Sequence, residues 1–293
     1  MPVASQIWNR GRRLFVSSPL FLRVVTAAPT VPIVVVAILE GGGLWAAIVA
    51  LTLVVAMIEF GAAVGISRRD PLLAILAAAA AAIPAVALLS DIPRTWPLTA
   101  ALLALAAFPI AAGTGLRLGG LIEPTDIRAL APRLAYAVFA LIYFAWLGSF
   151  LVALRELPQG EEWTLLALFA VMAADTGAFV VGKLGGRRLL VPQLSPNKTV
   201  EGALGGFAAG FATVLLINLL PDLNVPLEKM VILAFVLPLM AGIGDLAEST
   251  LKRSLNVKDL GGMLPGHGGV PDRLDSLLFG VPTVYFFVLW AVI

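Results

Sequence analysis

The sequence predicts an all-α fold, a polytopic integral membrane protein with about nine transmembrane helices. Apolar residues make up 60% of the 293 residues, whereas a soluble domain contains about 45–50%. The mean hydropathy is correspondingly high, at +0.97. The apolar residues also gather into stretches near the roughly 20 residues that a helix needs to cross a bilayer. Together these observations indicate that the bilayer is the solvent of most of the chain.

The apolar stretches follow one another with short polar connections. In chain order they are Leu22–Leu39, Leu44–Ile66, Pro71–Leu89, Pro97–Gly113, Leu134–Leu154, Trp163–Gly182, Val200–Leu220, Leu227–Ala247 and Leu277–Ile293. Several contain Pro or Gly, which membrane helices tolerate when neighbouring groups satisfy the freed backbone. We expect about four spans in an N-terminal part, 1–133, and about five in a C-terminal membrane domain, 134–293, with polar loops at 183–199 and 249–276.

The distribution of Lys and Arg predicts the orientation in the membrane. Cytoplasmic loops carry an excess of these residues. If the N-terminus is cytoplasmic, all but Arg94, Arg155 and Lys229 of the 20 Lys and Arg fall on the cytoplasmic side. No small-residue cleavage site follows the first apolar run, so we interpret the N-terminus as a cytoplasmic lead-in rather than a removed signal peptide. A bacterial-type cytoplasmic membrane is the expected location.

Overall charge and cysteine content exclude several functions. The formal net charge is only +2, too small an excess to indicate a nucleic-acid partner. The chain has no cysteine, which excludes disulfides, a thiolate metal site and a cysteine nucleophile.

Polar residues concentrate in Ser249–Asp275, a stretch with apolar sequence on both sides. It holds the only histidine, His267, within Pro265-Gly266-His267-Gly268-Gly269. This Pro- and Gly-rich segment cannot form regular helix, and its glycines let the backbone approach a ligand closely. We expect the stretch to carry chemistry on the cytoplasmic face.

Carboxylates flank this stretch. If the preceding helix continues past the membrane, Asp245, Glu248 and Lys252 share one helix face, and Asp272 and Asp275 share a face at the start of the last helix. Clustered carboxylates with one His and no Cys favour a hard, oxygen-liganded ion such as Mg²⁺ over zinc. Acidic side chains that can hold a metal, next to basic side chains that can bind phosphate, indicate phosphoryl or nucleotidyl transfer.

Two upstream segments complete the polar set. Asp175 lies inside the sixth apolar stretch. Inserting a carboxylate at the centre of a membrane helix costs about 2.5–3.5 kcal/mol. Asp175 is therefore either functional or structural, in which case it pairs with an Arg or caps a broken helix. The loop Lys183–Glu201 contains Ser195-Pro196-Asn197-Lys198-Thr199, a turn-forming sequence whose Asn197 or Thr199 could cap the next helix. A helix start with Lys198 suits a phosphate, although an ordinary positive-inside loop has the same composition. Glu59, within the second stretch, is either functional or, as we expect, paired with a neighbouring helix.

These motifs resemble the phosphatidate cytidylyltransferases, also called CDP-diacylglycerol synthases. The long signature runs from Ser249 through Lys252-Arg253 and Lys258-Asp259 to Pro265–Gly269, Asp272-Arg273 and Asp275. Asp175-Thr176-Gly177-Ala178 and Ser195 to Gly202 are similar to the family's two upstream motifs, in the same order. The resemblance in detail covers about a third of the chain, from Ala174 to Ser276.

The resemblance implies transfer of CMP from CTP to phosphatidic acid, giving CDP-diacylglycerol and pyrophosphate for phospholipid biosynthesis. It also implies Mg²⁺ dependence, a second ion (K⁺) and a homodimer. The metal ligands implied first are Asp245 and Asp272, with Asp275 and Asp175 as second choices. The expected catalytic residues are Asp245, Asp272, Lys252, Arg253, His267 and Asp275. The expected substrate-binding residues are Ser195, Asn197, Lys198, Thr199, Asp175, Lys258 and Arg273.

Four other functions can be weighed against the sequence. The same chemistry on another lipid, or a CTP-using lipid kinase, would need similar acids and bases. A secondary transporter also has broken helices and intramembrane charges, but here the charges lie near one face and no internal repeat is evident. A structural membrane scaffold leaves the PGHGG segment beside paired carboxylates unexplained.

Overall fold

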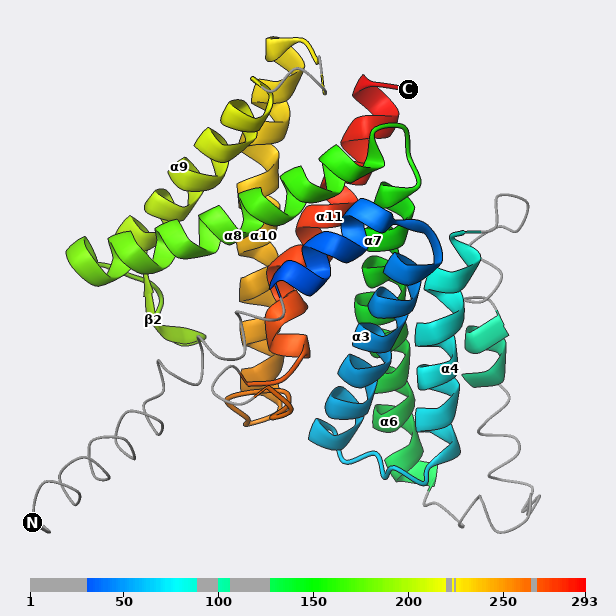
Figure 1. The fold of residues 1–293 in the computed structure, drawn as a ribbon. Coiled ribbons are helices and arrows are strands. Elements are labelled where there is room, and N and C mark those ends of the chain that lie inside the picture. Colours follow the sequence, from blue (N-terminus) through cyan, green and yellow to red (C-terminus); the bar gives the residue numbers. More distant parts are fainter. Residues whose placement is uncertain (1–30, 89–99, 106–126, 220–222, 224, 265–267) are drawn as a thin grey trace, which may run out of the picture.

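The structure is a computed structural model, and it describes residues 31–88, 100–105, 127–219, 223, 225–264 and 268–293 (Figure 1). Its named elements are α3 (Gly42–Ala63), α4 (Pro71–Val86), α6 (Ile127–Ala140), the π-helical segment η1 (Leu141–Trp146), α7 (Leu147–Arg155), α8 (Gly160–Gly185), β1 (Leu189–Val191), β2 (Ser195–Thr199), α9 (Val200–Ile217), α10 (Leu227–Ser254) and α11 (Pro271–Ala291). A further helix, Val31–Glu40, precedes α3. The predicted helical fold class is therefore confirmed.

Six helices of the described chain are long and apolar enough to cross a membrane. They are Gly42–Ala63, Ala131–Arg155, Gly160–Gly185, Val200–Ile217, Leu227–Ser254 and Pro271–Ala291. Val31–Glu40 and α4 are shorter apolar helices. The chain is thus a polytopic helical membrane protein. The count of nine stays a prediction, because much of Leu22–Leu39 and Pro97–Gly113 lies outside the described residues.

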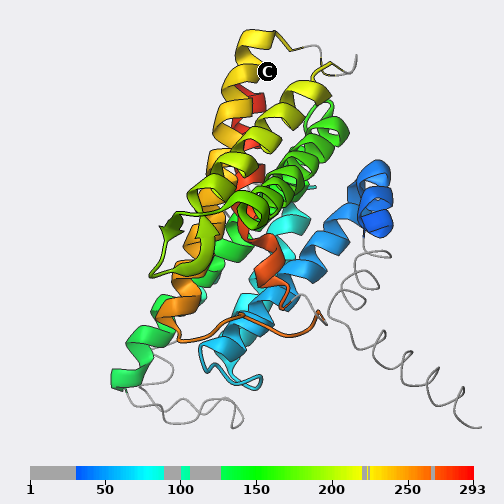
Figure 2. The ribbon, with the colours of Figure 1, turned by 90° about the vertical axis from the view of Figure 1, so that its left-hand side faces the viewer.

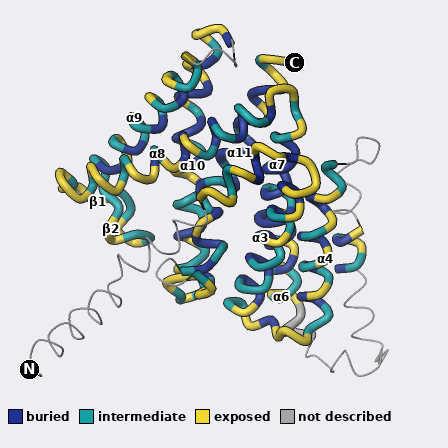
Figure 3. Tube along the Cα trace, viewed as in Figure 1, coloured by how far each residue is buried: buried dark blue, intermediate teal, exposed yellow. Residues whose placement is uncertain are grey.

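The helices differ in how much of their surface other helices cover. In Ala131–Arg155, 72% of the most apolar window is buried, against 22% in α9. Large apolar side chains of α9, such as Leu204 and Leu216, are exposed, and exposed positions run along its length in Figure 3. Lipid tails can cover such side chains at no cost, since they are as apolar as leucine. The fold therefore has a core around η1 and α7 and a lipid-accessible outer layer.

A cluster of aromatic rings lies within the core of the N-terminal half. Phe60 of α3 packs against Phe139 and Phe144, with ring centroids 5.9 and 5.5 Å apart. Tyr143 stacks on Phe139 and also contacts Phe279 of α11. These rings join α3 to α6, η1 and α11, and so fix the N-terminal helices against the C-terminal ones.

Small residues bring α8, α9 and α10 into close contact, and these helices lie side by side in Figures 1 and 2. A Cβ atom on Gly206 of α9 would lie 2.7 Å from the carbonyl oxygen of Ala174 in α8. A Cβ on Gly210 would lie 2.8 Å from the ring of Pro238 in α10. The absence of side chains at these positions is what lets the helix backbones approach.

The β1–β2 hairpin is the one departure from helix among the named elements. Its strands pair antiparallel, with Leu189 opposite Thr199 and Val191 opposite Ser195. The sequence predicted turn-forming structure over Ser195–Thr199, and this was wrong: the segment is a strand. The predicted helix start was right, because Thr199 caps α9 by accepting a hydrogen bond from the Gly202 amide at 3.1 Å.

The α8–α9 contact predicts a strong dependence on glycine at one position. Gly206→Ala should lower stability by about 1–3 kcal/mol, because the new methyl group meets backbone that cannot move independently. Gly242→Ala in α10 is the matched control, since its Cβ would meet no atom within 4 Å. The measurement is the unfolding midpoint of the purified protein in detergent. Equal midpoints for the two variants would contradict this account of the packing.

Candidate active site

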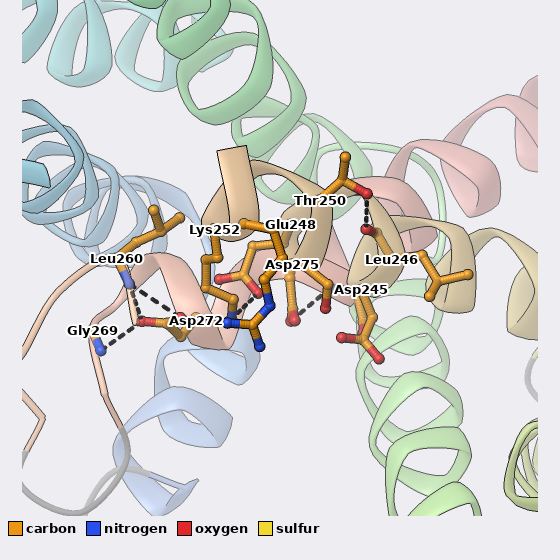
Figure 4. Close-up of polar contacts among 12 residues, drawn as sticks. Asp245, Leu246, Glu248, Thr250, Lys252, Leu260, Gly269, Asp272 and Asp275 are labelled. Carbon is orange, nitrogen blue, oxygen red and sulfur yellow. Dashed lines mark hydrogen bonds and ion pairs between the residues drawn. The ribbon is translucent and has the colours of Figure 1, made fainter. Parts of the chain in front are cut away.

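Three helices and the hairpin bring the predicted polar residues together. α10 ends at Ser254, seven residues past the predicted span, so Asp245, Glu248 and Lys252 do lie on one helical face. α11 begins at Pro271, whose fixed φ suits a first helical position, and carries Asp272 and Asp275 in its first turns. Figure 4 shows these side chains converging between the two helices.

Three carboxylates form the centre of the site. One oxygen from each of Asp245, Glu248 and Asp275 lies within 4.8 Å of the other two. The approach depends on Gly244, where a Cβ would lie 2.4 Å from the carbonyl oxygen of Asp275. The sequence placed Glu248 on the correct face but did not select it as a ligand.

These residues fit a bound cation. Three negative groups so close together repel each other unless positive charge lies between or beside them. Glu248 is 1% exposed, and its Oε1 accepts no hydrogen bond from the described residues. A buried oxygen without a donor is costly, and a hard cation satisfies it.

Lys252 joins the two helices of the site. Its Nζ lies 2.5 Å from Oε2 of Glu248 and 2.9 Å from Oδ1 of Asp272. Both carboxylates are nearly inaccessible, with side chains 1% and 2% exposed, so water screens this contact poorly. Lys252 thus offsets buried negative charge both on its own helix and on α11.

Asp272 has a different environment from the three clustered carboxylates. Besides Lys252, it accepts hydrogen bonds from the Gly269 amide at 2.9 Å and from the Leu260 amide at 3.1 Å (Figure 4). Its oxygens therefore hold the polar loop between α10 and α11. The prediction that Asp272 is a metal ligand stays a prediction.

The hairpin supplies a second lysine. Nζ of Lys198 in β2 lies 2.6 Å from Oδ1 of Asp245 and donates to Oγ of Ser249 at 3.3 Å. Arg253 of α10 donates from Nε to the carbonyl of Leu194 at 3.0 Å, and so fixes the hairpin against the helix. Lys198 is thereby placed at the edge of the carboxylate cluster.

The remaining predicted residues lie around this centre. Asp175 of α8 accepts a hydrogen bond from Oγ of Ser276 at 3.4 Å, which places it beside the start of α11. Arg273 and Lys258 are exposed, and Lys258 forms no ion pair within the described chain. Ser195 is half-buried and Asn197 exposed in β2. His267 lies outside the described residues.

Two further residues of the site were not selected as site residues from the sequence. Glu59 of α3 forms no ion pair with a neighbouring helix in the described part of the chain; it accepts hydrogen bonds from the amides of Gly262, Met263 and Val270. Tyr143 is 5% exposed, and its hydroxyl has no hydrogen-bond partner among the described residues. It lies in the π-helical segment η1, a distortion that is frequent at functional sites.

A cavity of about 440 Å³ lies beside the site, between α3 and the loop that follows α10. Most of its lining is apolar, with Val55 and Ile58 on one side and Leu260 and Met263 on the other. Arg68 also lines it.

Comparison with known proteins places this fold and site in a family. The sequence profile of the cytidylyltransferase family matches residues 21–291, nearly the whole chain. The chain therefore belongs to the cytidylyltransferase family, which confirms the resemblance seen in its motifs.

Curated relatives are similar to part of the chain. The phosphatidate cytidylyltransferase of Bacillus subtilis (strain 168) is 38% identical over 155 residues, which are 53% of this chain and 58% of that protein. The phosphatidate cytidylyltransferase of Staphylococcus saprophyticus is 40% identical over 147 residues, 50% of this chain and 56% of that protein. The protein of the same name from Staphylococcus aureus (strain COL) is 38% identical over 147 residues. The chain thus spans a little over half the length of these relatives.

The position of Lys252 predicts a large effect on stability. Lys252→Met should cost about 3–5 kcal/mol, because it leaves two buried carboxylates without their shared cation. Adding Glu248→Gln should restore part of the loss, since it removes one unpaired charge. Lys258→Met, at an exposed position, is the control. The measurement is the unfolding midpoint in detergent, and a midpoint for Lys252→Met equal to that of the control would contradict the prediction.

Proposed function

We propose that the chain is a phosphatidate cytidylyltransferase, which transfers CMP from CTP to phosphatidic acid and releases pyrophosphate. The observation that carries the proposal is the cluster of Asp245, Glu248 and Asp275, bordered by Lys198 and Lys252, in a membrane protein of the cytidylyltransferase family. Carboxylates suit a divalent cation, and lysines suit phosphate groups. The names of the curated relatives supply the substrates.

The carboxylate cluster would hold Mg²⁺ through Asp245, Glu248 and Asp275, with Asp272 and Asp175 as the further predicted ligands. When bound, Mg²⁺ neutralises triphosphate charge and leaves coordination positions for substrate oxygens. A second ion, K⁺, belongs to the same proposal. The three carboxylates of the cluster support a site for hard cations, because every ligand that they offer is an oxygen.

The reaction needs little proton transfer. A phosphate oxygen of phosphatidic acid forms the new bond to the α-phosphorus of CTP, while the bond from that phosphorus to the β-phosphate bridging oxygen breaks. Phosphate monoesters have a second pKa near 6, so the attacking group is already largely ionised at neutral pH. The protein contributes positioning and charge neutralisation.

Particular residues take these roles. Lys198, Lys252 and Arg253 neutralise the phosphates, and Arg273 pairs with carboxylates or phosphate. Ser195, Asn197, Thr199 and Lys258 contribute to substrate binding. His267 orients or donates a hydrogen bond rather than acting as a base.

The setting of the reaction is also part of the proposal. We place the site at the cytoplasmic face of a bacterial cytoplasmic membrane, because CTP is a cytosolic substrate and the relatives are bacterial proteins. Residues 134–293 form the catalytic membrane domain and residues 1–133 the N-terminal membrane helices. A homodimer is the expected assembly, and the mass of the protein–detergent complex measured by light scattering tests it.

The activity has a direct test. Purified protein incubated with labelled CTP, phosphatidic acid and Mg²⁺, with and without K⁺, should incorporate the nucleotide into lipid and release pyrophosphate. Asp245→Asn should lower this turnover by about 100-fold or more, because it removes a metal ligand and the partner of Lys198. His267→Ala should cost less.

Each other result has a clear meaning. Release of CDP without labelled lipid identifies a CTP-using kinase instead. Label transferred only to a different lipid of a substrate panel corrects the acceptor. Ion-driven uptake into liposomes without any nucleotide dependence identifies a transporter. Full turnover by Asp245→Asn contradicts the proposed metal site.

The Mg²⁺ requirement separates the roles of the carboxylates. Glu248→Gln and Asp275→Asn should raise the Mg²⁺ concentration for half-maximal turnover by about tenfold. Glu156→Gln is the control, because Glu156 is exposed at the end of α7 and is not one of the clustered carboxylates. An unchanged requirement in both variants would contradict their assignment as ligands.

Asp272→Asn resolves the remaining ligand in the same titration. A shift as large as that of Glu248→Gln supports the sequence prediction that Asp272 binds the metal. A loss of turnover without a shift assigns Asp272 to the loop amides that it contacts.

A further inference from the structure

The segment that joins α10 to α11 lies between two carboxylates from different helices. We call its residues 260–270 the signature loop; of these, 265–267 lie outside the described residues. Leu264 donates from its amide to the carbonyl of Gly268 at 3.0 Å, which brings the two described arms of the loop together. Asp272 of α11 binds one amide from each arm, those of Leu260 and Gly269.

Glu59 of α3 binds the same two arms from the other direction. Its Oε1 accepts hydrogen bonds from the amides of Gly262 and Met263, both at 2.8 Å. Its Oε2 accepts from the amide of Val270 at 2.7 Å. Both oxygens of one side chain, more than 200 residues away in sequence, are therefore committed to this loop.

The loop backbone is shaped for this carboxylate. A Cβ on Gly261 would lie 2.2 Å from the Glu59 carboxylate, and a Cβ on Gly269 would lie 2.6 Å from Cα of Gly261. Only glycine at these two positions permits the contact. Gly262, by contrast, would accept a Cβ with no atom within 4 Å.

Packing holds the loop at Leu260, which is 1% exposed in the hydrophobic core, but less so at the residues that follow. The cavity of about 440 Å³ lies against Gly261, Gly262 and Met263. The hydrogen bonds of Glu59, together with those of Asp272, fix the position of the loop there. Because they are charge-assisted, they are roughly twice as strong as bonds between neutral groups.

We propose that Glu59 is a positioning residue for the carboxylate site. It fixes the signature loop, the loop amides of Leu260 and Gly269 fix Asp272, and Asp272 fixes Lys252 beside Glu248. The N-terminal helices, which carry none of the predicted catalytic residues, thereby set the geometry of the C-terminal site. The effect on turnover rests on the proposed function, whereas the effect on the loop does not.

Hydrogen exchange of the full-length protein in detergent tests the contact itself. Glu59→Gln keeps the shape of the side chain but turns one acceptor oxygen into a donor that faces a backbone amide. Amides of residues 258–272 should exchange about tenfold faster than in the original protein. Asp70→Ala is the structural control, because it removes the α4 cap and the Arg133 pair without touching the loop. It should leave the loop exchange unchanged.

Turnover with CTP and phosphatidic acid tests the functional consequence. In Glu59→Gln, kcat should fall about tenfold while KM for CTP stays within about threefold, since the substrate contacts themselves remain. Asp70→Ala should lower the unfolding midpoint and leave kcat within about twofold. Unchanged exchange of residues 258–272 would overturn the proposal, and so would faster exchange with unchanged kcat. If the original protein shows no such turnover, the proposed function fails, while the exchange result still decides whether Glu59 holds the loop.

Two glycine variants give a second test that does not depend on the folding of Glu59→Gln. Gly261→Ala should reproduce the faster exchange of the loop, because its methyl group displaces the Glu59 carboxylate. Gly262→Ala has open space around the new methyl group and should behave as the original protein. Identical exchange in the two variants would overturn the proposal independently of Glu59→Gln.

Discussion

The contact of Lys252 with Glu248 and Asp272 is the interaction on which the polar site depends. α10 and α11 each carry carboxylates into a region with little water, and burying such groups without a counter-charge costs several kcal/mol. One ammonium group, 2.5 and 2.9 Å from the two partners, offsets part of that cost for both helices at once. This shared cation links α11 to α10 at the site, where Gly244 lets the two helices approach and brings Asp275 next to Asp245.

Local sequence patterns predicted the parts of the site that lie on single helices. The spacing of Asp245, Glu248 and Lys252 gave their common face, and Thr199 capped α9 as its residue type indicated. The Ser195–Thr199 strand was missed because its composition favours a turn, whereas its actual conformation depends on pairing with Leu189–Val191. Pairing partners of this kind are set by register across two strands, which no single segment encodes.

Contacts between distant segments were beyond prediction from periodicity. Glu59 looks like any intramembrane carboxylate, for which a basic partner on a neighbouring helix is the simplest expectation. Its actual partners are backbone amides near residue 260, and every residue type except proline offers the same amide. The family motif marked Gly269 but not Gly261, and only the fold shows that both make room for a side chain of α3.

Backbone amides satisfy Glu59, so its contacts with the loop use none of the basic side chains of the site. Counted as ionised, the carboxylates of Asp245, Glu248, Asp272 and Asp275 exceed the ammonium groups of Lys198 and Lys252 by two negative charges. A divalent cation cancels that charge, whereas a lysine paired with Glu59 instead of these acids would make the imbalance larger. The loop is thus held by uncharged donors, while the carboxylates of the site keep an excess of negative charge that suits the proposed divalent cation.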